Sequence, residues 1–453
     1  MLLGTETEYG IHAAGGELDA HDLSAAVVDA CGVPATASTG DASHRVLGNG
    51  ARFYVDHGHP EYATPETTSA ADATLWELAG DLIVERAAAA ASQRLGIPIT
   101  VFKNNTDGKG NSYGYHENLL VGRATPWEAL EAVLPAFLVS RVVIAGAGRV
   151  GLGTASQEPG FQLSQRADFF ERVAGLDTTR RRGIVNTRDE PHADPRRWRR
   201  LHVIAGDATR IPYATWLGLG SLALVVAAIE SGLAPLVRLA DPIVAFRTVS
   251  RDLSLSRPLP LAGGGAETAL GVQERFRDAA AALAGRVETP GATALVEAWT
   301  QTLDDLRVDP ARAADRLDWA AKLQLLRGYR ARGASWGDPK LAQVDLKWAQ
   351  LGPGGIVGVL QDAGRLRAGA DPAEVERAGR EAPRDTRAFG RGRWVSEHPE
   401  AVIAAGWDGL LVRDPAGGLH SLGLLDPFGH TAVGAEPGAS VDRLIRSHEE
   451  RTR

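Results

Sequence analysis

Short segments in which apolar and polar residues alternate predict β-strands, because side chains along a strand point to opposite faces in turn. In the segment ARFYVD, Arg52, Tyr54 and Asp56 fall on one face, while Phe53 and Val55 fall on the other. Gly58 and Pro60 are expected to end this strand. The strands predicted in this way cover 2–11, 51–56, 99–104 and 115–123, whereas 34–49 is loop-like.

Longer segments with apolar residues at helical spacing predict helices. The helix predicted at 70–95 ends before Gly96, a residue that commonly terminates helices. The run from Gly218 to Val237 approaches the length of a membrane span, but Glu230 and several Gly and Ser residues interrupt it. A buried helix fits that run better. The predicted helices are 22–31, 70–95, 127–147, 221–239, 267–306, 311–332 and 371–380. Strands with large helical insertions indicate an α+β fold whose mixed sheet is covered on one face.

Composition narrows the protein classes. The chain has 453 residues, which is too long for one compact core. A net charge of −7 argues against a nucleic-acid partner. Cys31 is a single cysteine, so a disulfide framework and a thiolate metal cluster are excluded, and a cytoplasmic location is expected. The N-terminus lacks the features of a signal peptide, and no membrane partner is expected.

The polar face of the 51–56 strand has a counterpart in the first strand, where Glu6 and Glu8 share one face. An exposed sheet edge would look the same for either strand alone. Two such strands, followed by His59 and Glu61, favour a site. Clustered carboxylates repel one another unless a cation neutralises them.

The oxygen atoms of this cluster suit a hard cation, Mg²⁺ or Mn²⁺. The candidate ligands are Glu6, Glu8, Tyr54 and Glu61. Mg²⁺ commonly bridges to phosphates, so a nucleotide is implied, with Arg52 as a candidate phosphate ligand. Zinc at His57 and His59 is disfavoured, because no third ligand stands at zinc-site spacing.

The glycine-rich segments do not indicate a dinucleotide-binding fold. The segment GAGRVG at 146–151 matches the dinucleotide fingerprint, but a loop follows it where a helix is required. Two polar clusters remain as candidates. One is YHEN, with His116 and Asn118 on one strand face, and the other is NTRDEPHAD, with Arg188 and His192. A solvated loop with internal salt bridges would explain the second equally well.

Several blocks resemble, in order, the Pup ligase and Pup deamidase/depupylase family. They are GTETEYGI, NGARFYVDHGHPEYATPE, FKNNTDGKGNSYGYHEN, GFQLSQRADFF, IVNTRDEPHAD, RRLHVIAGDAT and DWAAKLQLLRGYR, and they span most of the chain. The resemblance implies a glutamine synthetase-like curved mixed or antiparallel sheet that forms a cradle covered by helices. It also implies a catalytic domain at 1–380 and a small C-terminal α+β domain at 381–453.

The blocks divide between the two branches of that family. The Asp56-His57 pair, EPGFQLSQRADFF and DWAAKLQLLRGYR are similar to the depupylase, whereas GNSYG and YATPE are closer to the ligase. Depupylases usually carry a long insertion between the first strand and NGAR. Here about forty residues separate Ile11 from Asn49, as in the ligase.

Carried over by matching position, the resemblance implies ATP and Mg²⁺ as cofactors, and Pup and pupylated proteins as partners. Asp56 is the implied catalytic carboxylate. Glu6, Tyr54 and Glu61, with Glu8 nearby, are implied to hold Mg²⁺. The implied nucleotide contacts are Arg52, Thr64 and, from the small domain, Trp407.

The expected reaction is hydrolysis of an amide at the end of Pup, either the isopeptide bond from its C-terminal glutamate to a lysine or the side-chain amide of a C-terminal glutamine. Asp56 would attack the carbonyl or activate water, and Arg188, His116 or His192 could stabilise the developing charge. The alternatives are a ligase that forms the same bond, a non-catalytic binder, and a relative acting on another modifier.

Overall fold

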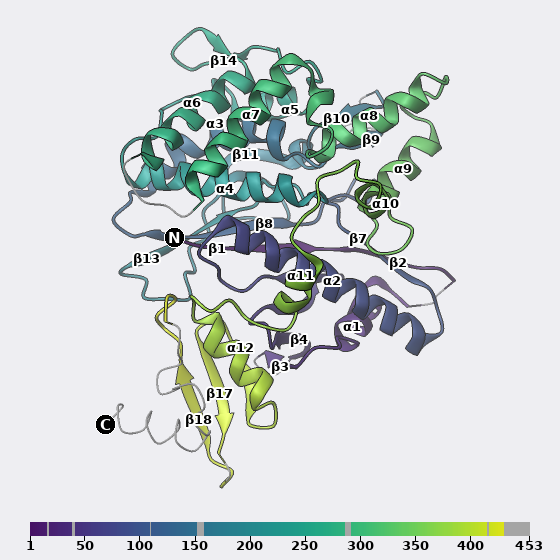
Figure 1. Cartoon of the computed structure of the whole chain (residues 1–453). Coiled ribbons are helices and arrows are strands. Elements are labelled where there is room, and N and C mark those ends of the chain that lie inside the picture. Colours follow the sequence, from purple (N-terminus) through teal and green to yellow (C-terminus); the bar gives the residue numbers. More distant parts are fainter. Residues whose placement is uncertain are drawn as a thin grey trace. The chain divides into compact units, whose positions relative to one another are not determined.

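The computed structural model describes residues 1–15, 18–38, 41–108, 110–151, 158–285, 291–414 and 416–429 (Figure 1). The chain divides into two compact units. The first unit combines both ends of the chain, Met1–Val101 and Ala370–Arg453, with the short segment Glu190–Arg199. The second unit contains Phe102–Asp189 and Arg200–Gly369.

Five strands of the first unit lie side by side in one sheet, each antiparallel to its neighbours. Their order is β1 (Leu2–Glu8), β6 (His59–Ala63), β5 (Arg52–Asp56), β4 (Asp41–Leu47) and β3 (Ala35–Ser38). Two further short strands, β2 (Gly10–Ala13) and β7 (Ile99–Phe102), pair with each other. Residues that lie opposite one another in an antiparallel pair share a face of the sheet, so this register decides which side chains meet.

Helices α1 (Ala20–Asp29) and α2 (Ala70–Leu95) contact each other and pack on these strands (Figure 1). Ser69 caps the first turn of α2, and Gly96 ends the helix in a left-handed conformation with φ of 69°. The covered face carries the aromatic ring of Tyr62, which lies so close to Gly80 of α2 that a Cβ there would be 2.3 Å from it. The apolar side chains of β5 and β6 therefore face the helices, and the polar side chains face away from them.

The C-terminal part of the first unit adds a small sheet with its own helix. Strands β16 (Val402–Ala405), β17 (Gly409–Arg413) and β18 (Leu419–Gly423) are antiparallel, and α12 (Ala388–Glu397) packs with them. Val46 of β4 belongs to the same buried cluster. Helix α11 (Pro372–Ala378) packs on α2. The domain boundary after residue 380 stays a prediction.

The second unit contains strands in the order β11 (Phe170–Gly175), β12 (Arg182–Asn186), β13 (Trp198–Val203) and β8 (Tyr115–Gly122), with β11 and β12 parallel. Two small antiparallel strand pairs are β9 (Arg149–Gly151) with β10 (Gly160–Gln162), and β14 (Leu259–Pro260) with β15 (Ala266–Glu267). The α-helices are α3 (Trp127–Ala145), α4 (Pro212–Glu230), α5 (Pro242–Arg251), α6 (Ala269–Ala284), α7 (Ala292–Val308), α8 (Asp318–Arg330), α9 (Pro339–Ala349) and α10 (Ile356–Asp362), and the short 3₁₀ turns are Ala167–Phe169 and Pro310–Ala313.

Helices α3 and α4 contact β12 and β8, and α6 and α7 pack outside them. Helix α4 is long and apolar enough to span a membrane, with a mean hydropathy of 1.6 over its best window, but 78% of that window is buried inside the structure. This burial agrees with the expected core helix.

Several expectations about the elements are wrong. Segment 34–49 forms strands β3 and β4 instead of a loop. The strand expected at 51–56 does end at Asp56, before Gly58, and Pro60 lies inside the next strand, β6. The helix expected at 221–239 begins earlier, at Pro212, because proline is favoured in the first helical turn. The helices expected at 267–306 and 311–332 are each divided in two, the latter into a 3₁₀ turn and α8.

Candidate active site

Carboxylates from three neighbouring strands of the first unit converge on the face that the helices leave uncovered. Glu8 of β1 lies opposite Glu61 of β6, and Glu61 lies opposite Tyr54 of β5. One carboxylate oxygen from each of Glu8, Asp56 and Glu61 lies within 4.8 Å of the other two. The Tyr54 hydroxyl donates a hydrogen bond of 2.5 Å to Glu61. The sequence-predicted polar face is therefore a real cluster.

The cluster is electrostatically unfavourable by itself. Glu8 and Glu61 are only 7% and 3% exposed. Burial raises the pKa of Glu61 well above its usual 4.5, and the charges of Glu8 and Glu6 raise it further. Burial also raises the pKa of Tyr54, and the charge of Glu61 adds to this. A bound cation would remove this repulsion, and the oxygen-only donor set fits Mg²⁺.

Asp56, which the sequence assigned to catalysis, lies in the same carboxylate cluster. Of the four predicted ligands, Glu8, Tyr54 and Glu61 come together, and Glu6 lies two residues before Glu8 on the same face of β1. The nearby histidines have other partners. Nδ1 of His57 lies 2.8 Å from Oδ2 of Asp56, and Nδ1 of His59 lies 3.0 Å from the carbonyl oxygen of Tyr9.

The predicted nucleotide contacts also lie in the first unit. The guanidinium of Arg52 lies 5.4 Å from the ring centre of Tyr54 and 5.7 Å from that of Trp407. The guanidinium of Arg391 lies 4.9 Å from the same ring centre of Trp407. Thr64 is buried, and its hydroxyl accepts a hydrogen bond of 2.9 Å from the backbone N–H of Thr5. Arg52 and Trp407 thus form one wall of the candidate nucleotide site, whereas the hydrogen bond of Thr64 to Thr5 connects the end of β6 to β1.

A buried ion-pair network, which sequence reasoning missed, supports this wall. The Glu66 carboxylate accepts hydrogen bonds from both Arg387 and Arg391, whose side chains are 5% and 0% exposed. Arg391 also donates to the carbonyl oxygens of Gly50 and Trp407, at 2.7 and 2.8 Å. The network connects the end of β6 to α12 and to the Trp407 backbone.

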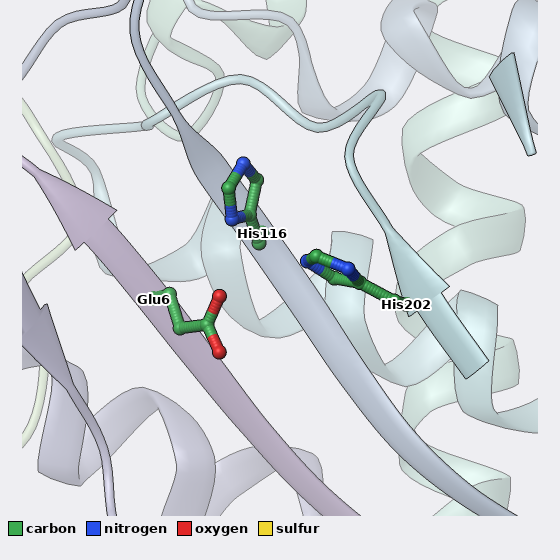
Figure 2. A group of neighbouring side chains, drawn as sticks. All are labelled: Glu6, His116 and His202. Atoms are coloured by element: carbon green, nitrogen blue, oxygen red, sulfur yellow. The ribbon is translucent and has the colours of Figure 1, made fainter. Parts of the chain in front are cut away.

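The predicted second-unit residue His116 lies on β8 beside His202 of β13 (Figure 2). The two ring centres are 4.9 Å apart at an interplanar angle of 84°, and His202 is 1% exposed. Figure 2 also draws Glu6 on its own strand, β1, of the first unit. His202 was not among the predicted site residues, although the quoted block RRLHVIAGDAT contains it.

The remaining predicted residues lie on the segment that follows β12. Arg188 is half-buried, and its backbone N–H donates to the Asn186 side chain at 2.9 Å. His192 is exposed, has a left-handed backbone with φ of 47°, and its carbonyl oxygen accepts a hydrogen bond from Arg387. Their catalytic roles, like the ligand roles above, stay predictions.

Comparison with known proteins places the chain in a family. The model of the Pup-ligase protein family matches residues 1–411. The chain belongs to this family. It is 43% identical over 423 residues to the Pup deamidase/depupylase of Mycobacterium tuberculosis (strain CDC 1551 / Oshkosh), covering 91% of this chain and 83% of that protein. It is 38% identical to the Pup–protein ligase of Corynebacterium jeikeium (strain K411), covering 99% of this chain and 98% of that one.

Solved structures of the Pup-ligase family agree with the fold. The ligase PafA in complex with Pup superposes with a TM-score of 0.86 at 34% identity, covering 99% of this chain and 92% of that one. PafA in complex with ADP gives a TM-score of 0.81 at 34% identity, covering 92% and 91%. The fold is therefore α+β of the glutamine synthetase-like class, as expected.

Proposed function

We propose that this protein hydrolyses amide bonds at the C-terminus of Pup, in the cytoplasm. The substrates are the isopeptide bond between the C-terminal glutamate of Pup and a protein lysine, and the side-chain amide of a C-terminal glutamine. The observation that carries the proposal is the 43% identity, over 91% of this chain, to relatives named Pup deamidase/depupylase. The Asp56 carboxylate beside Glu8 and Glu61 supports it.

The proposed cofactors are ATP and Mg²⁺, supported by the solved relative in complex with ADP and by the oxygen donors described above. Mg²⁺, when bound, would neutralise the clustered carboxylates and the phosphate charge. In this proposal the nucleotide is a cofactor and is not consumed. The proposed metal ligands are Glu6, Glu8, Tyr54 and Glu61, and the proposed nucleotide contacts are Arg52, Thr64 and Trp407.

Amides are poor electrophiles, so the reaction needs an activated nucleophile and a group that stabilises the oxyanion. Asp56 either attacks the amide carbonyl itself or takes a proton from the attacking water. The C–N bond then breaks and one water is consumed in either case. Its hydroxyl ends on the Pup carboxyl group, through hydrolysis of an acyl-Asp56 anhydride where Asp56 is the nucleophile, and its proton ends on the lysine amine or ammonia that leaves. Arg188, His116 and His192 are the proposed oxyanion stabilisers. Asp56, 40% exposed, is accessible to such a substrate.

A second candidate function is ligation, in which ATP would phosphorylate the glutamate and Asp56 would act as base toward the lysine. One observation favours it. The chain covers 98% of the Corynebacterium jeikeium ligase but 83% of the Mycobacterium tuberculosis depupylase. The segment between β2 and β5 is also short, as expected for a ligase: it contains α1, β3 and β4, and about forty residues separate Ile11 from Asn49.

One pair of reactions separates the two functions. In the first, the pure protein is incubated with nucleotide, Mg²⁺ and a preformed Pup–protein conjugate, and free Pup is measured by mass spectrometry. In the second, ATP, Mg²⁺, Pup ending in glutamate and a lysine-bearing protein are supplied. Release of Pup in the first reaction is expected. New conjugate with stoichiometric ADP in the second, and no release in the first, would identify a ligase instead.

A further inference from the structure

The turn between β5 and β6 places a histidine directly beside the proposed catalytic carboxylate. Asp56 lies opposite His59, so His57 and Gly58 alone form the turn. Both have left-handed backbones, with φ of 47° and 84°. Two-residue hairpin turns of this kind favour Asn-Gly, since asparagine and glycine adopt positive φ with the least strain. A histidine at the first position is therefore not the choice that the turn alone would make.

The turn is fixed from outside the sheet. The hydroxyl of Ser24 on α1 donates a hydrogen bond of 2.8 Å to the carbonyl oxygen of Gly58. With the backbone held there, Nδ1 of His57 lies 2.8 Å from Oδ2 of Asp56. A carboxylate oxygen can only accept, so this ring nitrogen carries the hydrogen. The contact with Asp56 raises the pKa of His57 above its usual 6.5.

The position of the Asp56 carboxylate needs such a partner. Its oxygen lies within 4.8 Å of carboxylate oxygens from Glu8 and Glu61, which repel it. Aspartate side chains rotate about two bonds, and repulsion would turn this one toward solvent, where it is already 40% exposed. A donor on Oδ2 holds the group in place and leaves the other oxygen for the reaction.

We propose that His57 is a positioning residue for the proposed hydrolase, which holds Asp56 through the Nδ1–H···Oδ2 hydrogen bond so that its second oxygen meets the amide or the attacking water. This inference rests on the proposed function of Asp56. It assigns the ring no contact with the substrate. What matters is the donor at the Nδ1 position, and a side chain with a similar donor can replace the ring.

Two substitutions separate the donor from the backbone. His57→Asn keeps a residue that tolerates positive φ and offers an amide N–H near the Nδ1 position, whereas His57→Gly tolerates the same φ without a donor. We expect His57→Gly to lower kcat for conjugate cleavage about tenfold or more, with KM and nucleotide affinity within about twofold. His57→Asn should recover most of that kcat. His12→Asn, an exposed histidine on β2, is the matched surface control.

The inference is overturned if His57→Gly cleaves at the wild-type rate, or if His57→Asn is as slow as His57→Gly. Nitrogen-15 shifts of the imidazole give a readout independent of activity. They should report a hydrogen on Nδ1 of His57 in the wild type and its loss from Nδ1 in Asp56→Ala. The same tautomer in both proteins would overturn the inference as well. If the wild type ligates Pup and cleaves nothing, the proposed function fails, and the same variants are compared in ligation.

Discussion

The buried network around Glu66 gives the sharpest test of how the first unit is held together. Glu66→Gln keeps the size and one acceptor oxygen but removes the negative charge that Arg387 and Arg391 share. The two guanidiniums, 5% and 0% exposed, would then lie together without their counter-ion. Leaving a buried charge without its partner costs about 3–5 kcal/mol in proteins.

The pKa of Glu66 gives a second route to the magnitude. Burial alone would raise it, but the charges of Arg391 and Arg387 overcome burial and lower it from 4.5 to about 2. A pKa lowered from 4.5 to about 2 corresponds to about 3 kcal/mol of stability. Because the folded-state pKa is depressed, this stability is present above pH ~4.5 and is lost as the pH falls toward ~2.

The assay is hydrogen exchange of the peptides that cover α12 and β16–β18, since these elements depend on the network. At neutral pH we expect Glu66→Gln to accelerate their exchange by a factor equivalent to about 3 kcal/mol. Glu376→Gln is the matched control in the same unit, because Glu376 pairs with Arg86 where both side chains are 36% or more exposed. That pair should contribute less than about 1 kcal/mol. Equal exchange in both variants would refute the reasoning.

Three further predictions follow from the same geometry. Asp56→Asn should lower the rate of amide cleavage about 10²–10⁴-fold while nucleotide binding, measured by calorimetry, stays within about twofold; undiminished cleavage would exclude its catalytic role. Glu61→Gln should stabilise the metal-free protein, because it removes a carboxylate from the repelling cluster, and should abolish the rise in Tm with Mg²⁺ and ADP. Gly80→Ala should lower the free energy of unfolding by about 1–3 kcal/mol, because its Cβ would meet the Tyr62 ring. In the same denaturant titration, the control Gly358→Ala at an exposed position of α10 should raise it slightly.

The sequence predicted the polar face of the site because alternation along a strand depends on local geometry alone. Arg52, Tyr54 and Asp56 had to share a face once the segment was a strand, and Phe53 and Val55 had to take the other. The helix 70–95 was predicted to the residue, since Gly96 ends it and its apolar spacing is regular. Such features need no knowledge of the partner strands.

What the sequence could not supply was the pairing of distant segments. Glu66 and Arg391 are 325 positions apart, and nothing in either local pattern indicates that they meet. The same holds for His116 and His202, which are more than eighty positions apart in the chain. Segment 34–49 reads as a loop from sequence because its glycines and small residues hide the alternation of β3 and β4.

The two faces of the β1, β6 and β5 strands show why a bound cation is the economical explanation of the cluster. On the helix-covered face, Phe53 and Tyr62 are 0% and 1% exposed, as stability requires. On the opposite face of the same strands, Glu8, Asp56 and Glu61 bring their carboxylates together, and burial together with the neighbouring charges raises the pKa of Glu61. Apolar side chains there would give a more stable sheet, so the acidic set opposes folding until a ligand neutralises it. A ligand that binds only the folded state stabilises it by RT ln(1 + [L]/Kd), so the stability of the first unit should increase with the concentration of Mg²⁺ and nucleotide.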